Sequence, residues 1–284
     1  MRKIFLTIIF LLGTFALNAL EVSESFTYSN AFWQNSVYVS QDLNYLVNLG
    51  FNFDLTEYEN IENHIYTFSL PLVLKTENFV LLLRPFIIPD NANEASAFGA
   101  KTSFSFTIKK DEVDNSFADV FFALGFASQD AYVNKTGLSA NKEKFNQLAY
   151  EGGISLNYFN AYFFEISGNM FEYLSGISSV ESIAGVLDQQ NIASLDTLNY
   201  VLNLPKGSIG AKIRWNSQVS QSITTISYRF IEFQDKDISA QHSALFSTMI
   251  MMKNNFYINL AYNHIFIESQ KDKDIFKGSI SFKF

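Results

Sequence analysis

The chain lacks cysteine altogether, since none occurs among its 284 residues. It therefore has no disulfide framework, no thiol nucleophile and no cysteine that could carry a lipid anchor. Histidine is scarce as well, and the three that occur, His64, His242 and His264, are far apart in the sequence. Zinc sites group histidine and cysteine at short spacings, and calcium loops need a longer acidic pattern with a glycine. Nothing in the sequence predicts a metal site or a cofactor.

Positive charge is the second deficit. The chain has 20 Lys and Arg against 28 Asp and Glu, a net charge of −8, and no basic stretch offsets this balance. Proteins that bind nucleic acid neutralise its phosphates with Lys and Arg side chains. The composition therefore argues against nucleic acid as a partner.

Long apolar runs are absent after the amino terminus. The one run, Ile4 to Leu17, follows two basic residues and precedes the small residue Ala19. This order is typical of a secretory signal peptide, whereas a membrane-anchoring helix needs about 20 apolar residues. The sequence predicts a cleaved signal peptide at 1–19, which leaves 18 basic and 28 acidic residues and a net charge of −10.

What the chain does have is aromatic residues and alternation. It contains 30 Phe and 14 Tyr, and its last ten residues, 275–284, alternate apolar and polar side chains. Successive side chains of a strand point to opposite faces of the sheet, so this segment has one apolar and one polar face. The apolar face carries Phe276, Ile280, Phe282 and Phe284, and the polar face carries Lys277, Ser279, Ser281 and Lys283.

The same alternation recurs upstream and predicts twelve strands, with no sustained helical period. The expected strands are 43–55, 64–75, 79–89, 97–109, 117–127, 147–159, 161–172, 208–216, 221–232, 240–252, 255–268 and 275–284. Short connections interleave with others that are often longer. Short inner turns and longer outer loops are the asymmetry of a transmembrane barrel. The longest outer loops are expected at 128–146 and 173–207.

Residues 20–41 do not fit this series. One more strand would make an odd number, and single-chain bacterial barrels have an even number of strands. The segment is either periplasmic or lumen-lining, outside a wall of twelve strands formed by 42–284, or it is a first hairpin that turns at Asn30 to Gln34 and gives fourteen. Twelve strands is the preferred prediction and fourteen the alternative.

With this pattern the chain resembles the bacterial outer-membrane β-barrel superfamily over nearly its whole mature length. The resemblance implies an all-β, antiparallel, up-and-down transmembrane barrel in the bacterial outer membrane, surrounded by lipid. It also implies assembly by the barrel-assembly machinery, for which Ile280, Phe282 and Phe284 of the last strand would be the signal. Aromatic side chains gather at both membrane interfaces of such barrels. The aromatics expected at the inner interface are Tyr158, Tyr162, Trp215, Phe256 and Phe284.

The polar face of each predicted strand would line the lumen. The candidate lumen-lining charges are Arg84, Lys101, Asp119, Glu151, Glu165, Lys212, Arg214, Arg229 and Lys277. Their balance is cationic although the chain is acidic, which favours anionic or polar solutes because the charges of a lining set pore selectivity. Alternatively, these side chains pair with one another and plug the barrel, since unpaired buried charges are costly.

An enzyme is not predicted. Acyl transfer needs a histidine beside a serine at an accessible depth, whereas His242 and His264 fall in phase with lipid-facing residues. The carboxylates Asp119, Glu151 and Glu165 are explained by the barrel interior without a catalytic role. Two functional hypotheses therefore remain. The first is a small porin-like channel for passive passage of small polar or anionic solutes, and the second is a non-conducting structural or surface-binding protein that acts through loops 128–146 and 173–207.

Overall fold

The computed structural model describes most of the chain after the predicted signal peptide. The described residues are 20–29, 32–58, 64–89, 95–111, 115–133, 141–174, 204–217, 219–252, 255–268 and 272–284. The predicted signal peptide at 1–19 and most of the predicted loop at 173–207 lie outside them. None of the described residues belongs to a helix long and apolar enough to cross a membrane.

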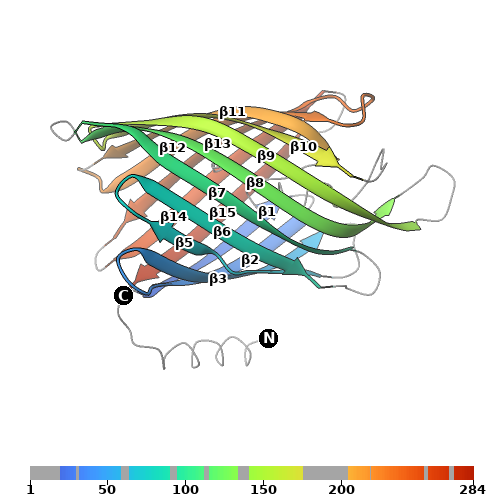
Figure 1. Cartoon of the computed structure of the whole chain (residues 1–284), viewed down its shortest axis with the longest axis horizontal. Helices are drawn as coiled ribbons and strands as arrows, with labels where there is room; N and C mark the ends of the chain where they lie inside the picture. Colours follow the sequence, from blue (N-terminus) through green and yellow to red (C-terminus); the bar gives the residue numbers. More distant parts are fainter. Residues whose placement is uncertain are drawn as a thin grey trace.

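Strands make up the described fold, and all the pairings between them are antiparallel (Figure 1). In chain order they are β1 (Leu20–Ser29), β2 (Phe32–Asp42), β3 (Val47–Tyr58), β4 (Ile65–Ser69), β5 (Leu72–Lys75), β6 (Phe79–Ile88), β7 (Ala95–Asp111), β8 (Ser116–Val133), β9 (Asn141–Tyr158), β10 (Tyr162–Tyr173), β11 (Pro205–Ser217), β12 (Ser222–Phe233), β13 (Gln241–Met251), β14 (Phe256–Ile267) and β15 (Lys273–Lys283).

The sheet closes on itself. Apart from β4 and β5, each strand pairs with its neighbours in sequence, and β1 pairs with β15 from Glu21↔Lys283 to Ser29↔Ile275. β4 and β5 are two pieces of one wall strand, because both pair with β3 on one side and β6 on the other. Pro71 lies at the break between them, and its carbonyl still accepts a hydrogen bond from Gly50 N at 2.7 Å. The wall is therefore a closed antiparallel barrel of 14 strands.

The preferred prediction of twelve strands is wrong, because residues 20–42 form two further wall strands that meet in a hairpin. The alternation in this hairpin was hard to recognise. Its outward face includes two polar residues, Glu24 on β1 and Asn35 on β2, which interrupt the apolar series of Val22, Phe26 and Val37. With the two strands of this hairpin added to the twelve predicted ones, the number of wall strands is fourteen and therefore even.

The middle strands are longer than the sequence predicts. β8 continues to Val133 and β9 begins at Asn141, and their pairing extends to these two residues. Most of the segment expected as an outer loop at 128–146 is therefore strand. Polar residues such as Ser128 and Gln129 favour a loop in the sequence, whereas in the structure both are buried in the barrel.

The two ends of the barrel differ. At one end, here called the terminal end, Phe284 N donates a hydrogen bond of 2.8 Å to Leu20 O, and the C label in Figure 1 marks this end. Tight turns connect strands there. Between β9 and β10, Phe159 and Asn160 have φ angles of 55° and 53°, and two consecutive positive φ angles are the signature of a type I′ hairpin turn. The opposite end, called the distal end, carries the longer connections, such as 174–204.

The two faces of the wall have different chemistry. The outer face exposes large apolar side chains, among them Leu124, Ile166 and Leu260 at 53%, 55% and 57%. Side chains next to these in sequence point to the other face, where Glu165 and Ser167 are buried. Exposed apolar groups around a closed wall with a polar inner face are the arrangement of a barrel surrounded by lipid.

Two adjacent glycines in β9 differ in how closely they are packed. At Gly153, which faces inward, an added Cβ would overlap the Phe121 ring and lie 2.5 Å from Ile166 O. At Gly152, which faces outward, the same atom would meet Phe122 Cδ1 at 3.8 Å, an ordinary contact. The Phe121 ring therefore occupies the place of the missing side chain at Gly153 alone.

Replacing Gly153 with alanine is expected to destabilise the barrel by about 2 kcal/mol, because overpacking forces side chains and backbone to shift. Gly152→Ala is the matched control and is expected to be close to neutral. Denaturant unfolding of the two variants in lipid vesicles measures the difference. Equal stability of the two variants would show that Phe121 can move aside without cost.

Candidate functional site: the barrel interior

A buried ion pair lies on the inner face between β10 and β11. Lys212 Nζ is 3.2 Å from Glu165 Oε2, and the two side chains are 6% and 3% exposed. Both residues were predicted to line the lumen, and the structure makes them direct cross-strand neighbours. Lys212 Nζ also lies 5.3 Å from the centre of the Phe163 ring, and the Arg214 guanidinium carbon lies 4.4 Å from the same centre. This part of the wall is a packed polar patch.

A second network is continuous with this patch. Arg229, 1% exposed, donates from Nε to Ser208 Oγ at 2.9 Å. Ser208 Oγ in turn donates to Asn169 Oδ1 at 2.7 Å. Buried charges are stable only when they are hydrogen-bonded or paired, so these contacts explain how the interior holds its cations.

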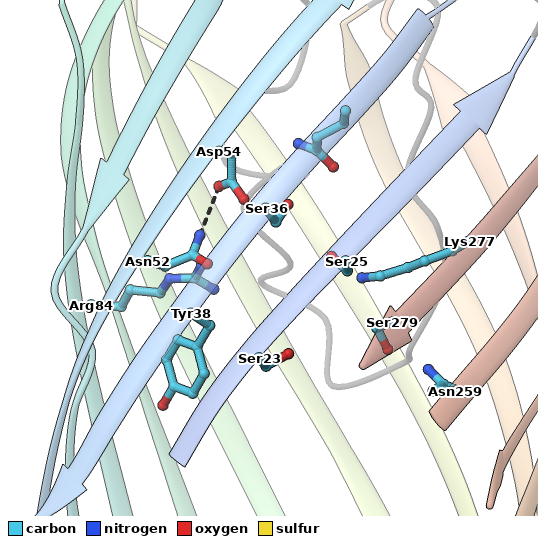
Figure 2. A pocket seen from close by; sticks show the side chains of 11 residues that line it. Ser23, Ser25, Ser36, Tyr38, Asn52, Asp54, Arg84, Asn259, Lys277 and Ser279 are labelled. Carbon is cyan, nitrogen blue, oxygen red and sulfur yellow. Dashed lines mark hydrogen bonds between the residues drawn. The ribbon is translucent and has the colours of Figure 1, made fainter. Parts of the chain in front are cut away.

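A polar cavity of about 230 Å³ lies elsewhere on the inner face, near the middle of its strands. Figure 2 shows Arg84 and Lys277 reaching into it from either side. Arg84 Nε donates to Ser69 Oγ at 3.0 Å. Asp54 accepts a hydrogen bond of 2.7 Å from Asn52 Nδ2. The lining residues are Ser23, Ser25, Gln34, Ser36, Tyr38, Asn52, Asp54, Arg84, Asn259, Lys277 and Ser279.

The chemistry of this cavity suits a polar solute that carries negative charge. Its lining has two cationic side chains, Arg84 and Lys277, against one carboxylate, Asp54. The remaining lining groups are hydroxyls and carboxamides, which can both donate and accept hydrogen bonds. A guanidinium can hold a carboxylate or phosphate through two parallel hydrogen bonds.

Sequence reasoning found only part of this lining. Arg84 and Lys277 were predicted to line the lumen, but the five residues contributed by β1 and β2 were not, because residues 20–41 lay outside the preferred wall of twelve strands. In β1, Ser23 and Ser25 lie on one face of the strand, and Phe26 and Tyr28 lie on the other. This alternation was the feature of the sequence that could have indicated a wall strand.

The interior becomes apolar toward the distal end. A buried hydrophobic cluster there combines residues of β4 and β6 to β10, namely Ile65, Phe86, Ile88, Ala97, Ala123, Ala127, Ala149 and Phe171. Alternation of apolar and polar residues predicts a polar inner face throughout, so this cluster departs from that prediction. The sequence feature that could have indicated this cluster is the uninterrupted apolar run Phe86-Ile87-Ile88, in which both faces of the strand are apolar. The run Ile265-Phe266-Ile267 at the distal end of β14 has the same form.

The structure places the predicted lumen-lining residues on the inner face. Lys101 and Glu151 are buried at 4% and 6% exposure. Asp119 accepts a hydrogen bond of 2.8 Å from Thr107 Oγ1. The nine predicted residues do not form one site, because Arg84 and Lys277 line the polar cavity while Glu165, Lys212, Arg214 and Arg229 belong to the packed patch of β10 to β12. Their part in solute passage stays a prediction.

The predicted interface aromatics lie at the terminal end. Tyr162 is paired with Tyr158 on one side and with Trp215 on the other. The rings of Phe256 and Phe282 lie 4.7 Å apart between β14 and β15. Ile280, Phe282 and Phe284 are exposed on the outer surface, and their role as an assembly signal stays a prediction.

His242 and His264 lie near the distal ends of β13 and β14. His242 Nδ1 is 2.6 Å from the hydroxyl of Tyr228, an outer-face side chain. His264 Nδ1 is 2.9 Å from Asp274 Oδ1. Neither contact involves a serine of the inner face. Within the part of the chain that the structure describes, no group of three or more His, Asp or Glu could hold a metal ion.

Comparisons with known proteins agree on the fold. No family model matches the chain, and no curated protein matches it. Among solved structures, CdiB from Acinetobacter baumannii is similar with a TM-score of 0.52 at 10% identity, over 95% of this chain and 61% of that chain. The CymD monoaromatic hydrocarbon channel is similar with a TM-score of 0.54 at 8% identity, over 94% of this chain and 88% of that chain.

A third structure, the NanC porin, matches with a TM-score of 0.44 at 9% identity, over 94% of this chain and all of that chain (100%). The present chain is shorter than CdiB and spans 61% of its length. At these identities the likeness to CdiB and CymD shows a common barrel fold.

Proposed function

We propose that the protein, which is an outer-membrane β-barrel, is a channel through which small anionic and polar solutes pass passively. The observation that carries the proposal is the polar cavity, where Arg84 and Lys277 meet a single carboxylate, Asp54. Likeness to a solved channel, CymD, adds support at the level of the fold only. The cavity between β1, β2, β3, β6, β14 and β15 is the selective part of the passage in this proposal.

The distal apolar cluster is the narrow part. Apolar constrictions in channels control passage because water leaves them readily. Solute would therefore cross an apolar zone near Phe86 and Phe171 before it reaches the cations of the cavity. The same cluster also favours the second candidate, a sealed barrel that acts through its surface, since packed apolar side chains can close a lumen completely.

Swelling of liposomes that contain the purified protein distinguishes the two candidates. A channel is expected to admit a small carboxylate faster than a neutral sugar of similar size, because the cavity attracts negative charge. A folded barrel that admits neither solute would contradict the channel and favour the sealed barrel. Heat-modifiable migration in gels verifies that the protein in the liposomes is folded.

Replacing Arg84 and Lys277 together with glutamine is expected to weaken anion preference. A unit charge at about 4 Å in water-like surroundings changes the energy of an ion by about 1 kcal/mol, roughly fivefold in occupancy. Because the variant removes two such charges, we expect the anion-to-cation permeability ratio, measured as a reversal potential in a salt gradient, to fall by at least about that factor. Lys206→Gln is the matched control, because Lys206 is exposed near the distal end and pairs with Glu232. If Lys206→Gln lowers the permeability ratio equally, the charges at the distal end of the barrel, and not those of the cavity, determine ion selectivity.

A further inference from the structure

One carboxylate lies midway along a strand on the outer surface of the wall. Glu24 is exposed on the same face of β1 as Phe26 and Tyr28. Among the described residues, the other outward carboxylates of the strands lie within three residues of a strand end, namely Glu57, Asp111, Asp130, Glu172, Glu232 and Asp274. Those positions are close to water at the rim, whereas Glu24 is surrounded by apolar neighbours: its cross-strand partners are Ile280 and Val37.

Glu24 has one polar neighbour on this surface. Asn35 Nδ2, on β2, donates a hydrogen bond of 3.2 Å to Glu24 Oε1. A carboxylate has a second oxygen, and a carboxamide has a second N–H and a carbonyl oxygen. The structure gives these remaining groups no partner within the described part of the chain. Polar groups that face hydrocarbon without partners are costly, because lipid offers no hydrogen bonds.

A second copy of the chain offers the missing partners. An interface on a two-fold axis brings the same patch of both copies together, so the patch must complement itself. The Glu24–Asn35 pair does so, because it combines a donor with an acceptor: Asn35 of each copy can donate to Glu24 of the other. Neither a lipid tail nor an apolar wall has groups that do this.

The surroundings of the pair suit close approach of two barrels. Next to the pair, the rings of Phe26 and Trp33 are stacked with centres 6.2 Å apart. On the other side, Gly278 of β15 faces outward opposite Phe26. An added Cβ at Gly278 would meet only Leu260 Cδ2, at 3.9 Å, so the surface is open there. Small residues let elements pack closely in membranes, and aromatic side chains supply contact area.

We propose that the outer face of β1 and β2 around Glu24 and Asn35 is the contact surface of a dimer of this chain in the membrane. The proposal concerns a surface outside the lumen, so it is independent of whether the barrel conducts. It also explains why two polar residues interrupt the apolar face of the first hairpin.

Disulfide cross-linking in native membranes tests the dimer, and the absence of natural cysteine makes single-cysteine variants unambiguous. Val37→Cys places a thiol on the outer face beside Glu24. Ile166→Cys, on the outer face of β10 and 55% exposed, is the matched control. Under mild oxidation we expect Val37→Cys to give a species of twice the chain mass, at least about tenfold more than the control gives. If Val37→Cys does not reach the membrane in folded form, Val22→Cys replaces it.

A second variant tests the role of the polar pair. Adding Asn35→Leu to the Val37→Cys chain removes both reciprocal hydrogen bonds of the dimer and is expected to reduce the cross-linked fraction by about tenfold. Heat-modifiable migration verifies folding of each variant. Equal cross-linking of Val37→Cys and Ile166→Cys would overturn the dimer. A cross-linked species of any mass other than twice that of the chain would also overturn it, because the partner would then be a different protein.

Discussion

Replacing Lys212 with methionine is expected to destabilise the folded barrel by about 3 kcal/mol, because it removes a cation that is paired with a buried carboxylate. Glu165 is 3% exposed on its side chain and lies 3.2 Å from Lys212 Nζ, so water cannot replace the lost cation. Denaturant unfolding in lipid vesicles, followed by tryptophan fluorescence, measures the loss.

Two further variants isolate the cause of this loss. Lys206→Met breaks an ion pair with Glu232 whose side chains are 63% and 54% exposed, and exposed pairs contribute at most about 1 kcal/mol. The double variant Glu165→Leu with Lys212→Met removes both buried charges and is expected to recover most of the stability, as replacements of buried ion pairs by apolar residues do. An equal loss of unfolding free energy for Lys212→Met and Lys206→Met would show that water reaches the interior around β10 and β11 and solvates the remaining carboxylate.

Replacing Phe171 with serine is expected to increase the single-channel conductance by about twofold or more, because a smaller, polar side chain keeps an apolar constriction hydrated. Phe171 is 3% exposed and belongs to the distal apolar cluster. Phe164→Ser is the control, since Phe164 lies on the outer face of the same strand and is 44% exposed. The measurement is unitary current in planar bilayers at fixed voltage and salt.

A folded Phe171→Ser barrel with unchanged conductance would place the distal cluster outside the conducting path. An increase shared by Phe164→Ser would instead indicate a general loosening of the wall. Heat-modifiable migration of both variants separates these outcomes from failure to fold.

The strands of the carboxyl-terminal third could be predicted closely from sequence. The expected segments 221–232 and 255–268 differ from β12 and β14 by one residue at each end. Alternation is clear in the middle of these strands: in β12, Ile226, Tyr228 and Phe230 face outward while Thr225, Ser227 and Arg229 face inward. Pairing of neighbours then follows from the short turns between them.

The first hairpin and the strand count could not be predicted as firmly. Glu24 and Asn35 occupy outward positions, where a residue that faces lipid is expected to be apolar. They interrupt the alternation of apolar and polar residues by which these two strands could have been identified from sequence. If these residues meet a second copy, the failure of the pattern and the contact surface have the same cause.

The polar cavity was beyond sequence reasoning for a different reason. Its lining comes from six strands, and Tyr38, Arg84 and Lys277 line the same cavity only because β1 closes the sheet against β15. That closure depends on the register of strands at opposite ends of the chain. The distal cluster was missed because the alternation rule was applied to strand ends where both faces are apolar, as at Ile265 to Ile267.

Single-channel recording with a salt gradient across a planar bilayer is the most direct test of the central claim, that the interior is a selective passage. For protein purified from membranes, we predict stable conductance steps and a reversal potential that indicates anion preference. Absence of steps from a folded barrel, or steps with cation preference, would contradict the role proposed for Arg84 and Lys277.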